Sequence, residues 1–303
     1  MAEPFLIRAA FAAILVALIA GSLASIKIAS IRARMVTWWV LAAVLVTALA
    51  LGPPGVTALF ALISFLALRE FLSLAPTRRA DRPALLLAYA MVPVSYGVMA
   101  AGAYAVWLLV LPVYGFLLLP AILLLNGRTD QYLSAAGTIQ WGLMATTFCI
   151  GHAAMLVYVP ADEAPAGGAG LLIFLLVVTA LNDVFQFICG KLIGGPKITP
   201  TISPNKTWAG FLGGWALTGA LILAIGPLYT GLGWWPLMLL AVLLPPAGFV
   251  GDLTMSAIKR DMGVKDVSNF LPGHGGVLDR VDSLAFTAPL TFHTFAYFAS
   301  ERF

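Results

Sequence analysis

Two polar stretches of this 303-residue chain carry side chains suited to phosphate and metal chemistry. The first covers residues 182–210 and the second covers residues 251–282. Their acids and bases include Asp183, Lys206, Asp252, Lys259, Arg260, Lys265, Asp266, Asp279 and Asp282. Carboxylates with no cysteine beside them favour Mg²⁺ over zinc, and Lys and Arg side chains neutralise phosphates. The residue types therefore predict a site where Mg²⁺ meets a phosphorylated ligand.

The spacing of four acids predicts that they lie at one depth of the molecule. Asp279 and Asp282 are three residues apart at the start of an apolar run, so on a helix they share one face. Asp252 ends another apolar run, and Asp183 lies one to two turns before the end of a third. Four carboxylates this close would repel one another unless cations lay among them. Mg²⁺ usually takes one or two protein carboxylates and fills its other positions with water and substrate phosphates.

Each of these residues also has a simpler interpretation. Lys259 and Arg260 are typical of an anchor on the positively charged side of a membrane. Asp279 is equally typical of a helix N-cap, and Asp282 of a residue that complements the helix dipole. Asp183 is harder to explain without a function, because an ionisable residue inside a membrane span costs about 2.5–3.5 kcal/mol.

A glycine-rich turn lies within the second stretch. Gly273, Gly275 and Gly276 would let backbone amides approach a phosphate closely, although turns use glycine pairs constantly. His274, between these glycines, suits a phosphate contact, a general acid or a turn residue. The sequence leaves these three interpretations open.

The elements that position these residues must lie in a lipid bilayer. Hydrophobic residues make up 61% of the chain and charged residues 10%, with a mean hydropathy of +0.98. Soluble domains have about 25% charged residues, so a water-soluble protein is excluded. The formal charge of +4 is too small for a nucleic-acid-binding surface.

The apolar runs predict an all-α fold, that of a polytopic integral membrane protein with about ten transmembrane helices. A span needs about 20 apolar residues, and Gly or Pro divides the longest runs. The spans are predicted near residues 5–26, 35–51, 56–75, 83–101, 104–126, 134–159, 168–190, 208–230, 234–256 and 279–300. The first is interpreted as a retained helix and not a cleaved signal peptide, because Arg8 lies inside it and Glu3 precedes it.

The charges of the connecting loops support ten spans. Loops on the cytoplasmic side of a membrane are enriched in Lys and Arg. The odd-numbered loops carry Lys27, Arg32, Arg34, Arg78, Arg79, Arg82, Arg128, Lys191, Lys197, Lys206, Lys259, Arg260 and Lys265. The even-numbered loops carry no basic residue, and one of them holds Asp162 and Glu163. This alternation predicts that the odd loops face the cytoplasm and that both termini lie outside.

Two regions are predicted along the chain. Residues 1–165 form N-terminal transmembrane helices, and residues 166–303 form a C-terminal catalytic transmembrane region with cytoplasmic loops 191–207 and 257–278. Cys149 and Cys189 are interpreted as packing residues, because neither has the spacing of a zinc site or redox pair. His152 and His293 are interpreted as hydrogen-bonded structural residues.

The second stretch closely resembles the signature of the phosphatidate cytidylyltransferases, or CDP-diacylglycerol synthases. The match runs over 27 positions in register, as Ser256-x-x-Lys259-Arg260-x-x-x-x-Lys265-Asp266, then Pro272-Gly273-His274-Gly275-Gly276-x-x-Asp279-Arg280-x-Asp282. Gly251-Asp252 and Ser203-Pro204-Asn205-Lys206-Thr207-Trp208 look like two further blocks of that family. The resemblance covers roughly residues 170–300. The family usually has Glu at the position of Ala209 and Ala-Tyr at the positions of Gln186-Phe187, so the lipid substrate of this chain is less certain than its reaction class.

The resemblance implies transfer of CMP from CTP to phosphatidic acid, with CDP-diacylglycerol and pyrophosphate as products of phospholipid synthesis. It implies Mg²⁺ as cofactor, the bilayer as setting, a bacterial inner membrane with the site facing the cytoplasm, and no nucleic acid as partner; a homodimer is left open. The implied catalytic residues are Asp252, Lys259, Asp279 and Asp282, and the implied metal ligands are Asp252, Asp279 and Asp183. The implied substrate-binding residues are Ser203, Lys206, Thr207, Ser256, Arg260, Lys265, Asp266, His274, Gly275, Gly276 and Arg280.

Two other classes of function compete with this prediction. Another CTP-dependent lipid enzyme, either a polyprenol kinase or an archaeol-type cytidylyltransferase, would share the membrane setting and the chemistry. A transporter would place acids near the middle of the membrane, often in repeated halves. Here the acids are predicted at one membrane face and no internal repeat is evident, so the transporter is disfavoured.

Overall fold

The computed structural model describes the chain apart from residues 1, 28, 77, 126, 128, 161, 266, 269, 271–274 and 300–303. The described residues form ten helical segments, which confirms the predicted all-α membrane fold. Eight of them, all but those at residues 29–50 and 278–299, are long and apolar enough to cross a membrane. The uninterrupted long helices are α1 (Ala2–Lys27), α2 (Ala29–Ala50), α3 (Gly52–Leu74), α4 (Arg82–Ala100), α9 (Gly167–Ile193), α10 (Trp208–Thr230), α11 (Trp234–Asp261) and α12 (Leu278–Ala299).

The other two segments contain short stretches of wider or tighter helix. One consists of α5 (Tyr104–Leu109), the π-helical turn η2 (Val110–Gly115) and α6 (Phe116–Leu124). The other consists of α7 (Tyr132–Leu143), the π-helical turn η3 (Met144–Cys149), α8 (Ile150–Met155) and the 3₁₀ turn η4 (Leu156–Tyr158). A 3₁₀ turn, η1 (Arg79–Asp81), precedes α4. Pro112 lies inside η2 and lacks the N–H that a regular α-helical hydrogen bond requires.

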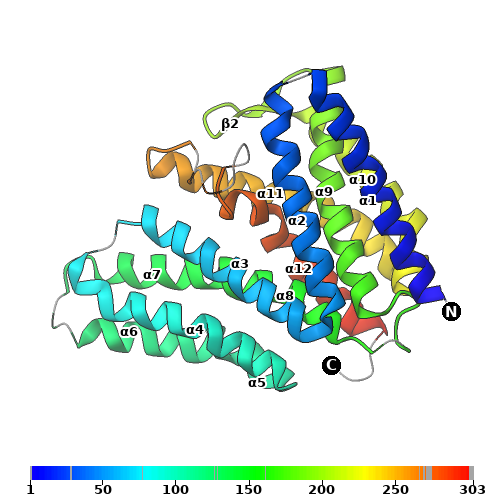
Figure 1. Cartoon of the computed structure of the whole chain (residues 1–303). Coiled ribbons are helices and arrows are strands. Elements are labelled where there is room, and N and C mark those ends of the chain that lie inside the picture. Colours follow the sequence, from blue (N-terminus) through cyan, green and yellow to red (C-terminus); the bar gives the residue numbers. More distant parts are fainter. Residues whose placement is uncertain are drawn as a thin grey trace.

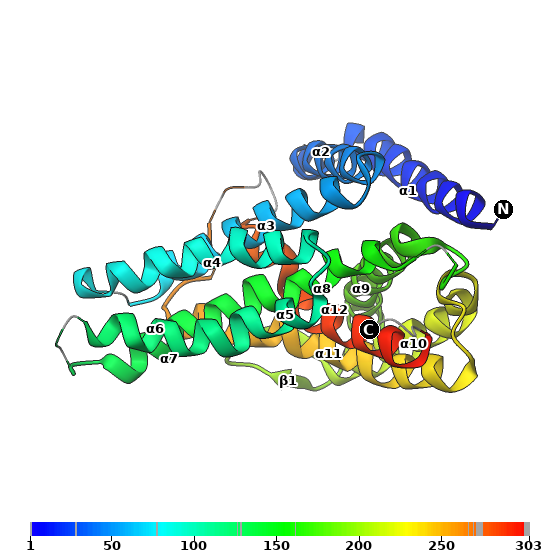
Figure 2. The ribbon, with the colours of Figure 1, turned by 90° about the horizontal axis from the view of Figure 1, so that it is seen from below.

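The helices pack in two groups, one formed by the C-terminal helices and one formed around α3. The C-terminal helices pack in the order α9 on α10, α10 on α11 and α11 on α12, whereas α3 packs on α4, α8 and α12. Helix α1 packs on both α2 and α9, and Figure 1 shows α4, α6 and α7 on the opposite side of the molecule. Seen from below, α1 and α2 stand at the edge beyond α3 (Figure 2). Helix α12 therefore connects the early helices of the chain to the late ones.

Side-chain contacts join four of the odd-numbered loops in two pairs. Arg78 Nη1 lies 3.3 Å from an Asp130 carboxylate oxygen, which joins the loops before α4 and α7. Arg260 Nε donates to the Ile202 carbonyl at 3.3 Å, which joins the end of α11 to the connection before α10. At the opposite end, the Tyr229 hydroxyl donates to the Leu6 carbonyl at 3.3 Å. These contacts agree with the alternation of loop charge.

Helix α11 continues past its predicted end at residue 256 and runs to Asp261. The added turn contains Lys259 and Arg260, which are good helix formers and which complement the negative C-terminal end of the helix dipole. Asp252 and Lys259 consequently lie on one rigid element. Asp252 therefore stands inside the helix, whereas the sequence had predicted it at the end of the helix.

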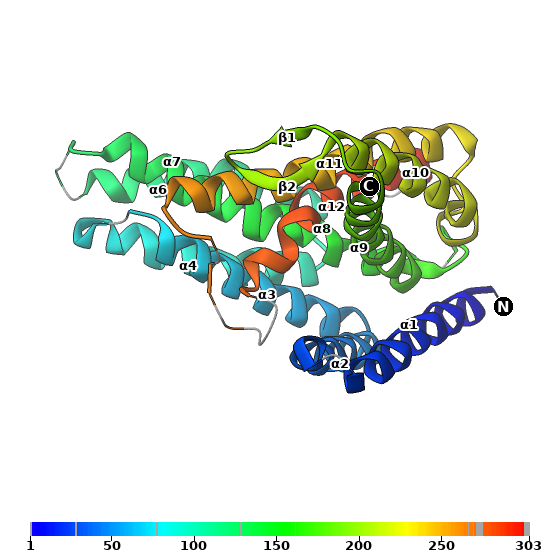
Figure 3. The same ribbon diagram turned by 90° about the horizontal axis from the view of Figure 1, so that it is seen from above.

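A short hairpin joins α9 to α10 and is absent from the sequence-based prediction. Strand β1 (Lys197–Thr199) pairs antiparallel with β2 (Ser203–Thr207), and Lys197 is opposite Thr207 (Figure 3). Gly194 and Gly195 have φ of 71° and 95°, which ends α9 in a conformation that favours glycine. Because the prolines at 200 and 204 disfavour helix, the segment adopts an extended form.

Two histidines and two cysteines fall within helical segments, as expected. His152 Nε2 lies 3.0 Å from His293 Nε2, and His152 Nδ1 lies 2.9 Å from the Phe148 carbonyl. Cys149 and Cys189 are both free thiols. The hydrogen bonds agree with the structural interpretation of the histidines.

Candidate functional site

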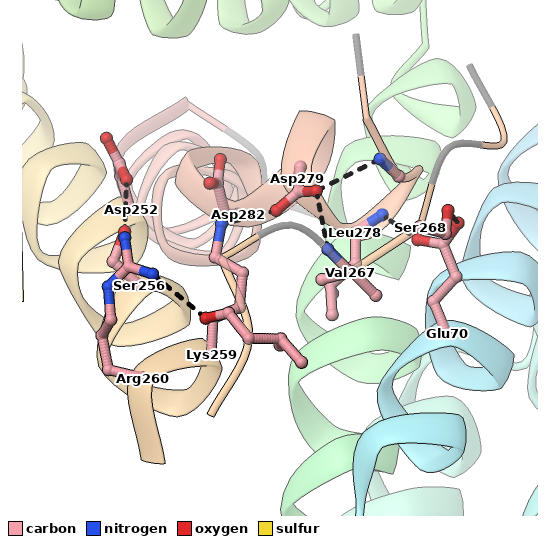
Figure 4. Close-up of polar contacts among 12 residues, drawn as sticks. Glu70, Asp252, Ser256, Lys259, Arg260, Val267, Ser268, Leu278, Asp279 and Asp282 are labelled. Carbon is pink, nitrogen blue, oxygen red and sulfur yellow. Dashed lines mark hydrogen bonds and ion pairs between the residues drawn. The ribbon is translucent and has the colours of Figure 1, made fainter. Parts of the chain in front are cut away.

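Four elements bring the predicted acids and bases together. Helix α9 carries Asp183, β2 carries Lys206, α11 carries Asp252 and Lys259, and α12 carries Asp279 and Asp282. Figure 4 shows the polar residues of α11 and α12 beside the segment that precedes α12 and beside Glu70 of α3. The site thus lies at the connection between α9 and α10 and the connection between α11 and α12.

The first ion pair joins the hairpin to α11. Lys206 Nζ lies 2.6 Å from Asp252 Oδ2 and 4.3 Å from the centroid of the Phe249 ring. The Ser256 hydroxyl donates to Asp252 Oδ1 at 3.2 Å, one helical turn away. The face of an aromatic ring attracts an ammonium group by a cation–π interaction. Lys206 is therefore held in place by a carboxylate and a ring, both from α11.

The second ion pair joins α11 to α12 and is more buried. Lys259 Nζ lies 2.6 Å from Asp279 Oδ1, and the two side chains are 12% and 7% exposed. The other carboxylate oxygen of Asp279 accepts the backbone N–H of Gly276 at 3.1 Å and that of Val267 at 3.4 Å. Asp279 lies inside the first turn of α12 and accepts N–H groups from residues that precede the helix, so it is not the N-cap that its simpler interpretation predicted.

The acids lie at two levels along α11. Asp252 repels Asp183 and Asp282 electrostatically, whereas Asp279 pairs with Lys259. Because Asp252 precedes Lys259 by seven residues, the two levels are about 10 Å apart along the helix axis. Among the described residues, no three His, Cys, Asp or Glu side chains form a group that could hold a metal ion. A metal site made of Asp183, Asp252 and Asp279 therefore remains a prediction.

A buried amide fixes the helix that carries Asp183. Asn182, the preceding residue, is fully buried, donates to the Pro245 carbonyl at 3.1 Å and accepts the Thr218 hydroxyl at 3.1 Å. These bonds tie α9 to α11 and α10. Asp183 is exposed beside this network and accepts the Ser283 hydroxyl of α12 at 3.3 Å. Its position is consequently determined by three neighbouring helices.

A cavity of about 440 Å³ opens at the level of Asp183 and Asp252. Helices α9, α10 and α11 and the hairpin form its walls, and Lys191, Lys197 and Lys206 contribute three ammonium groups. Three rings supply its apolar surface: those of Phe187, Phe211 and Phe249. This volume lies within the range of small-molecule sites, about 300–1,000 Å³. Basic, acidic and aromatic groups together suit a nucleotide.

The other predicted substrate-binding residues do not all lie in the cavity. Ser203 and Thr207 line the cavity, and the Thr207 hydroxyl also caps α10 by accepting the Gly210 N–H at 3.0 Å. Arg260 braces two connections, since it donates to the carbonyls of Ile202 and Val264. Lys265 and Arg280 are exposed, and Gly275 has a φ of 79°. Asp266 and His274 lie outside the described residues.

Sequence reasoning missed three residues of this region. Lys191 and Lys197 line the cavity, although each was interpreted only as a positive loop charge. Glu70 of α3 is 7% exposed and contacts the segment before α12. A signal for Glu70 was present, because an ionisable residue inside an apolar run is costly and usually functional.

Comparison with known proteins gives the family. Residues 32–298 match the Cytidylyltransferase family. The chain is 41% identical over 265 residues to the uncharacterized protein YnbB of Escherichia coli (strain K12), which covers 87% of each chain. It is 38% identical over 185 residues to the phosphatidate cytidylyltransferase of Brucella abortus biovar 1, covering 61% of this chain and 66% of that protein. It is 32% identical over 235 residues to the phosphatidate cytidylyltransferase of Staphylococcus epidermidis, covering 76% and 85%. This integral membrane protein therefore belongs to the cytidylyltransferase family of nucleotidyltransferases.

Proposed function

We propose that the protein transfers CMP from CTP to phosphatidic acid, which yields CDP-diacylglycerol and pyrophosphate. The observation that carries this proposal is the pairing of Lys206 with Asp252 and of Lys259 with Asp279 at one end of the helices, beside a lysine-lined cavity. The relatives named phosphatidate cytidylyltransferase support the choice of substrate. A lipid phosphate and a soluble nucleotide would meet at such a membrane-end site.

The chemistry requires no nucleophilic side chain. An oxygen of the lipid phosphate is already anionic near neutral pH and attacks the α-phosphorus of CTP in line. The bond from the α-phosphorus to the oxygen bridging to the β-phosphate breaks, and pyrophosphate leaves with that electron pair. The barrier arises mainly from charge spread over phosphoryl oxygens, so the protein contributes positioning and counter-charges.

Four basic residues would supply those counter-charges. Lys206 and Lys259 neutralise carboxylates and would turn to phosphate oxygens when substrates bind, while Arg260 and Lys265 lie at the same end of α11. The released carboxylates would then be free to bind a cation.

The acids fit Mg²⁺ by the chemistry of their donor atoms. Asp183, Asp252 and Asp282 repel one another in electrostatic terms, and a cation among them would relieve that repulsion. We assign Asp252 as a ligand of this cation, with Asp183 and Asp282 as further contacts, and Asp279, which lies at the other level of α11, as a ligand of a separate cation. Mg²⁺, when bound, would neutralise charge on the phosphates.

An assay of the purified protein in detergent tests the proposal. Labelled CTP, Mg²⁺ and phosphatidic acid should give CDP-lipid and pyrophosphate in equal amounts. Parallel reactions with an ether-linked lipid phosphate and with a polyprenol distinguish the two alternative enzymes, because a kinase would release CDP instead of pyrophosphate. Absence of CDP-lipid from every phosphorylated lipid would refute the proposal.

The same proposal includes the side of the membrane that the site faces. CTP is a cytoplasmic nucleotide, and the basic connections that meet at the site are those expected to face the cytoplasm. We place the protein in a bacterial inner membrane with the site on its cytoplasmic side.

A further inference from the structure

A buried carboxylate outside the catalytic region contacts the segment that leads into α12. Glu70 lies near the end of α3 and is 7% exposed. Its Oε1 accepts the Ser268 hydroxyl at 2.7 Å, and its Oε2 accepts the backbone N–H of Leu278 at 2.8 Å. Leu278 is the first residue of α12, so Glu70 satisfies a donor at a helix N-terminus, where an anion is favoured.

Asp279 binds the same two stretches of chain through neighbouring residues. It accepts the N–H of Val267, next to Ser268, and the N–H of Gly276, two residues before Leu278. Glu70 and Asp279 therefore both accept hydrogen bonds at the start of the segment between residues 268 and 276, from residues 267 and 268. Both also accept hydrogen bonds at its end, from residues 276 and 278. Close packing reinforces this arrangement, because a Cβ added to Gly276 would lie 2.6 Å from Glu70 Oε2.

We propose that Glu70 is a positioning residue, which together with Asp279 holds the two ends of the segment between residues 268 and 276 so that the Asp279 carboxylate faces Lys259. Glu70 does not line the cavity and pairs with no basic side chain in the described part of the chain. Its effect on the reaction therefore passes through the segment and Asp279. The proposal rests on the function proposed above, although its structural half can be tested separately.

Three substitutions distinguish a positioning role of Glu70 from a purely structural role in folding. Glu70→Leu removes both acceptors, whereas Glu70→Gln keeps both contacts, because its amide oxygen accepts the Leu278 N–H and its NH₂ donates to the Ser268 hydroxyl. We expect Glu70→Leu to lower kcat by about 10–100-fold with little change in KM for CTP. Glu70→Gln should remain within about threefold of the wild type. Asp81→Leu is the matched control, since Asp81 is buried at the same end of the molecule but bonds Arg78.

Hydrogen–deuterium exchange supplies a readout that does not depend on activity. In Glu70→Leu the amide of Leu278 should exchange faster than in the wild type, and in Glu70→Gln and Asp81→Leu it should not. The inference is wrong if Glu70→Leu keeps the wild-type kcat. It is also wrong if Glu70→Leu and Asp81→Leu lose the same amount of activity and if that loss is proportional to the loss of folded protein. If Glu70→Leu does not fold, Ser268→Ala tests the same contact, with a smaller fall in kcat expected and an unchanged kcat overturning the proposal. A wild-type protein without CDP-lipid synthesis would refute the proposed function, and the exchange experiment would still decide the role of Glu70.

Discussion

At the residue scale, two lysines neutralise two aspartates. The Lys259 and Asp279 side chains are 12% and 7% exposed, whereas those of Lys206 and Asp252 are 16% and 31% exposed. Removing one partner of a buried pair leaves an uncompensated charge and costs about 3–5 kcal/mol, whereas replacing both by apolar groups is often neutral. The two pairs should consequently respond differently to substitution.

The buried pair allows stability and activity to be separated. Lys259→Met alone should lower the thermal midpoint markedly, and the double change Lys259→Met with Asp279→Leu should recover much of it. CDP-lipid synthesis should fall by about 10²–10³-fold in both proteins, because a charge that stabilises phosphoryl oxygens is missing. Asp261→Asn, on the exposed end of α11, is the control and should be unaffected. Full activity in the double variant would contradict the assigned roles.

At the element scale, the approach of α11 to α12 sets the distance between the acids that they carry. Gly251 is buried next to Asp252, and a Cβ at that position would lie 2.6 Å from the Asp282 backbone carbonyl. No side chain fits between the two helices there. Backbone contact at this glycine thus brings the carboxylates of Asp252 and Asp282 close enough to repel each other.

Gly251→Ala should force α11 and α12 apart. Since the clashing atom belongs to the backbone, relief requires a helix shift, and we expect a lower thermal midpoint together with at least a tenfold loss of activity. A shift of about 1 Å in catalytic geometry can cost about 10²-fold. Gly97→Ala in α4 is the matched control, because nothing lies within 4 Å of its Cβ position. It should be neutral or slightly stabilising, as expected for Gly→Ala in a helix. Wild-type activity in Gly251→Ala would show that the contact is not needed.

The sequence predicted the helices far better than the contacts between them. Runs of apolar residues and alternating loop charge predicted ten helical segments, because both depend only on local composition. The hairpin was missed, since a five-residue strand rich in polar residues has no apolar periodicity. Glu70 was missed because its partners, Ser268 and Leu278, lie about 200 residues away and only the packing of α3 on α12 brings them together.

At the scale of the whole molecule, the two ends of the helices differ in charge. Lys197 is exposed on the hairpin side, and Asp162 is exposed in the connection before α9. Contacts such as Arg260 with Ile202 tie the basic connections together at the first end. The bilayer would hold these two ends on opposite sides.

Labelling of single cysteines tests this orientation. In a background with Cys149→Ser and Cys189→Ala, we expect Asp162→Cys to react with a membrane-impermeant maleimide in intact cells. Lys197→Cys should react only after the membrane is opened. Because Lys197 lines the cavity, elution of both variants as folded protein in size-exclusion chromatography serves as the control for folding. The reverse pattern would place the site on the outer side and contradict the cytoplasmic assignment.

The link from Glu70 to Leu278 has a consequence for biosynthesis. The two residues are 208 positions apart, so at about 5–20 residues per second the ribosome needs roughly 10–40 s to pass from one to the other. During that interval α3 carries an ionisable group without its hydrogen-bond partners, which is costly in a membrane. Translation of α12 therefore completes the site and also supplies the hydrogen-bond partner of Glu70 in α3. We expect nascent α3 to depend on the insertion machinery until α12 has been made.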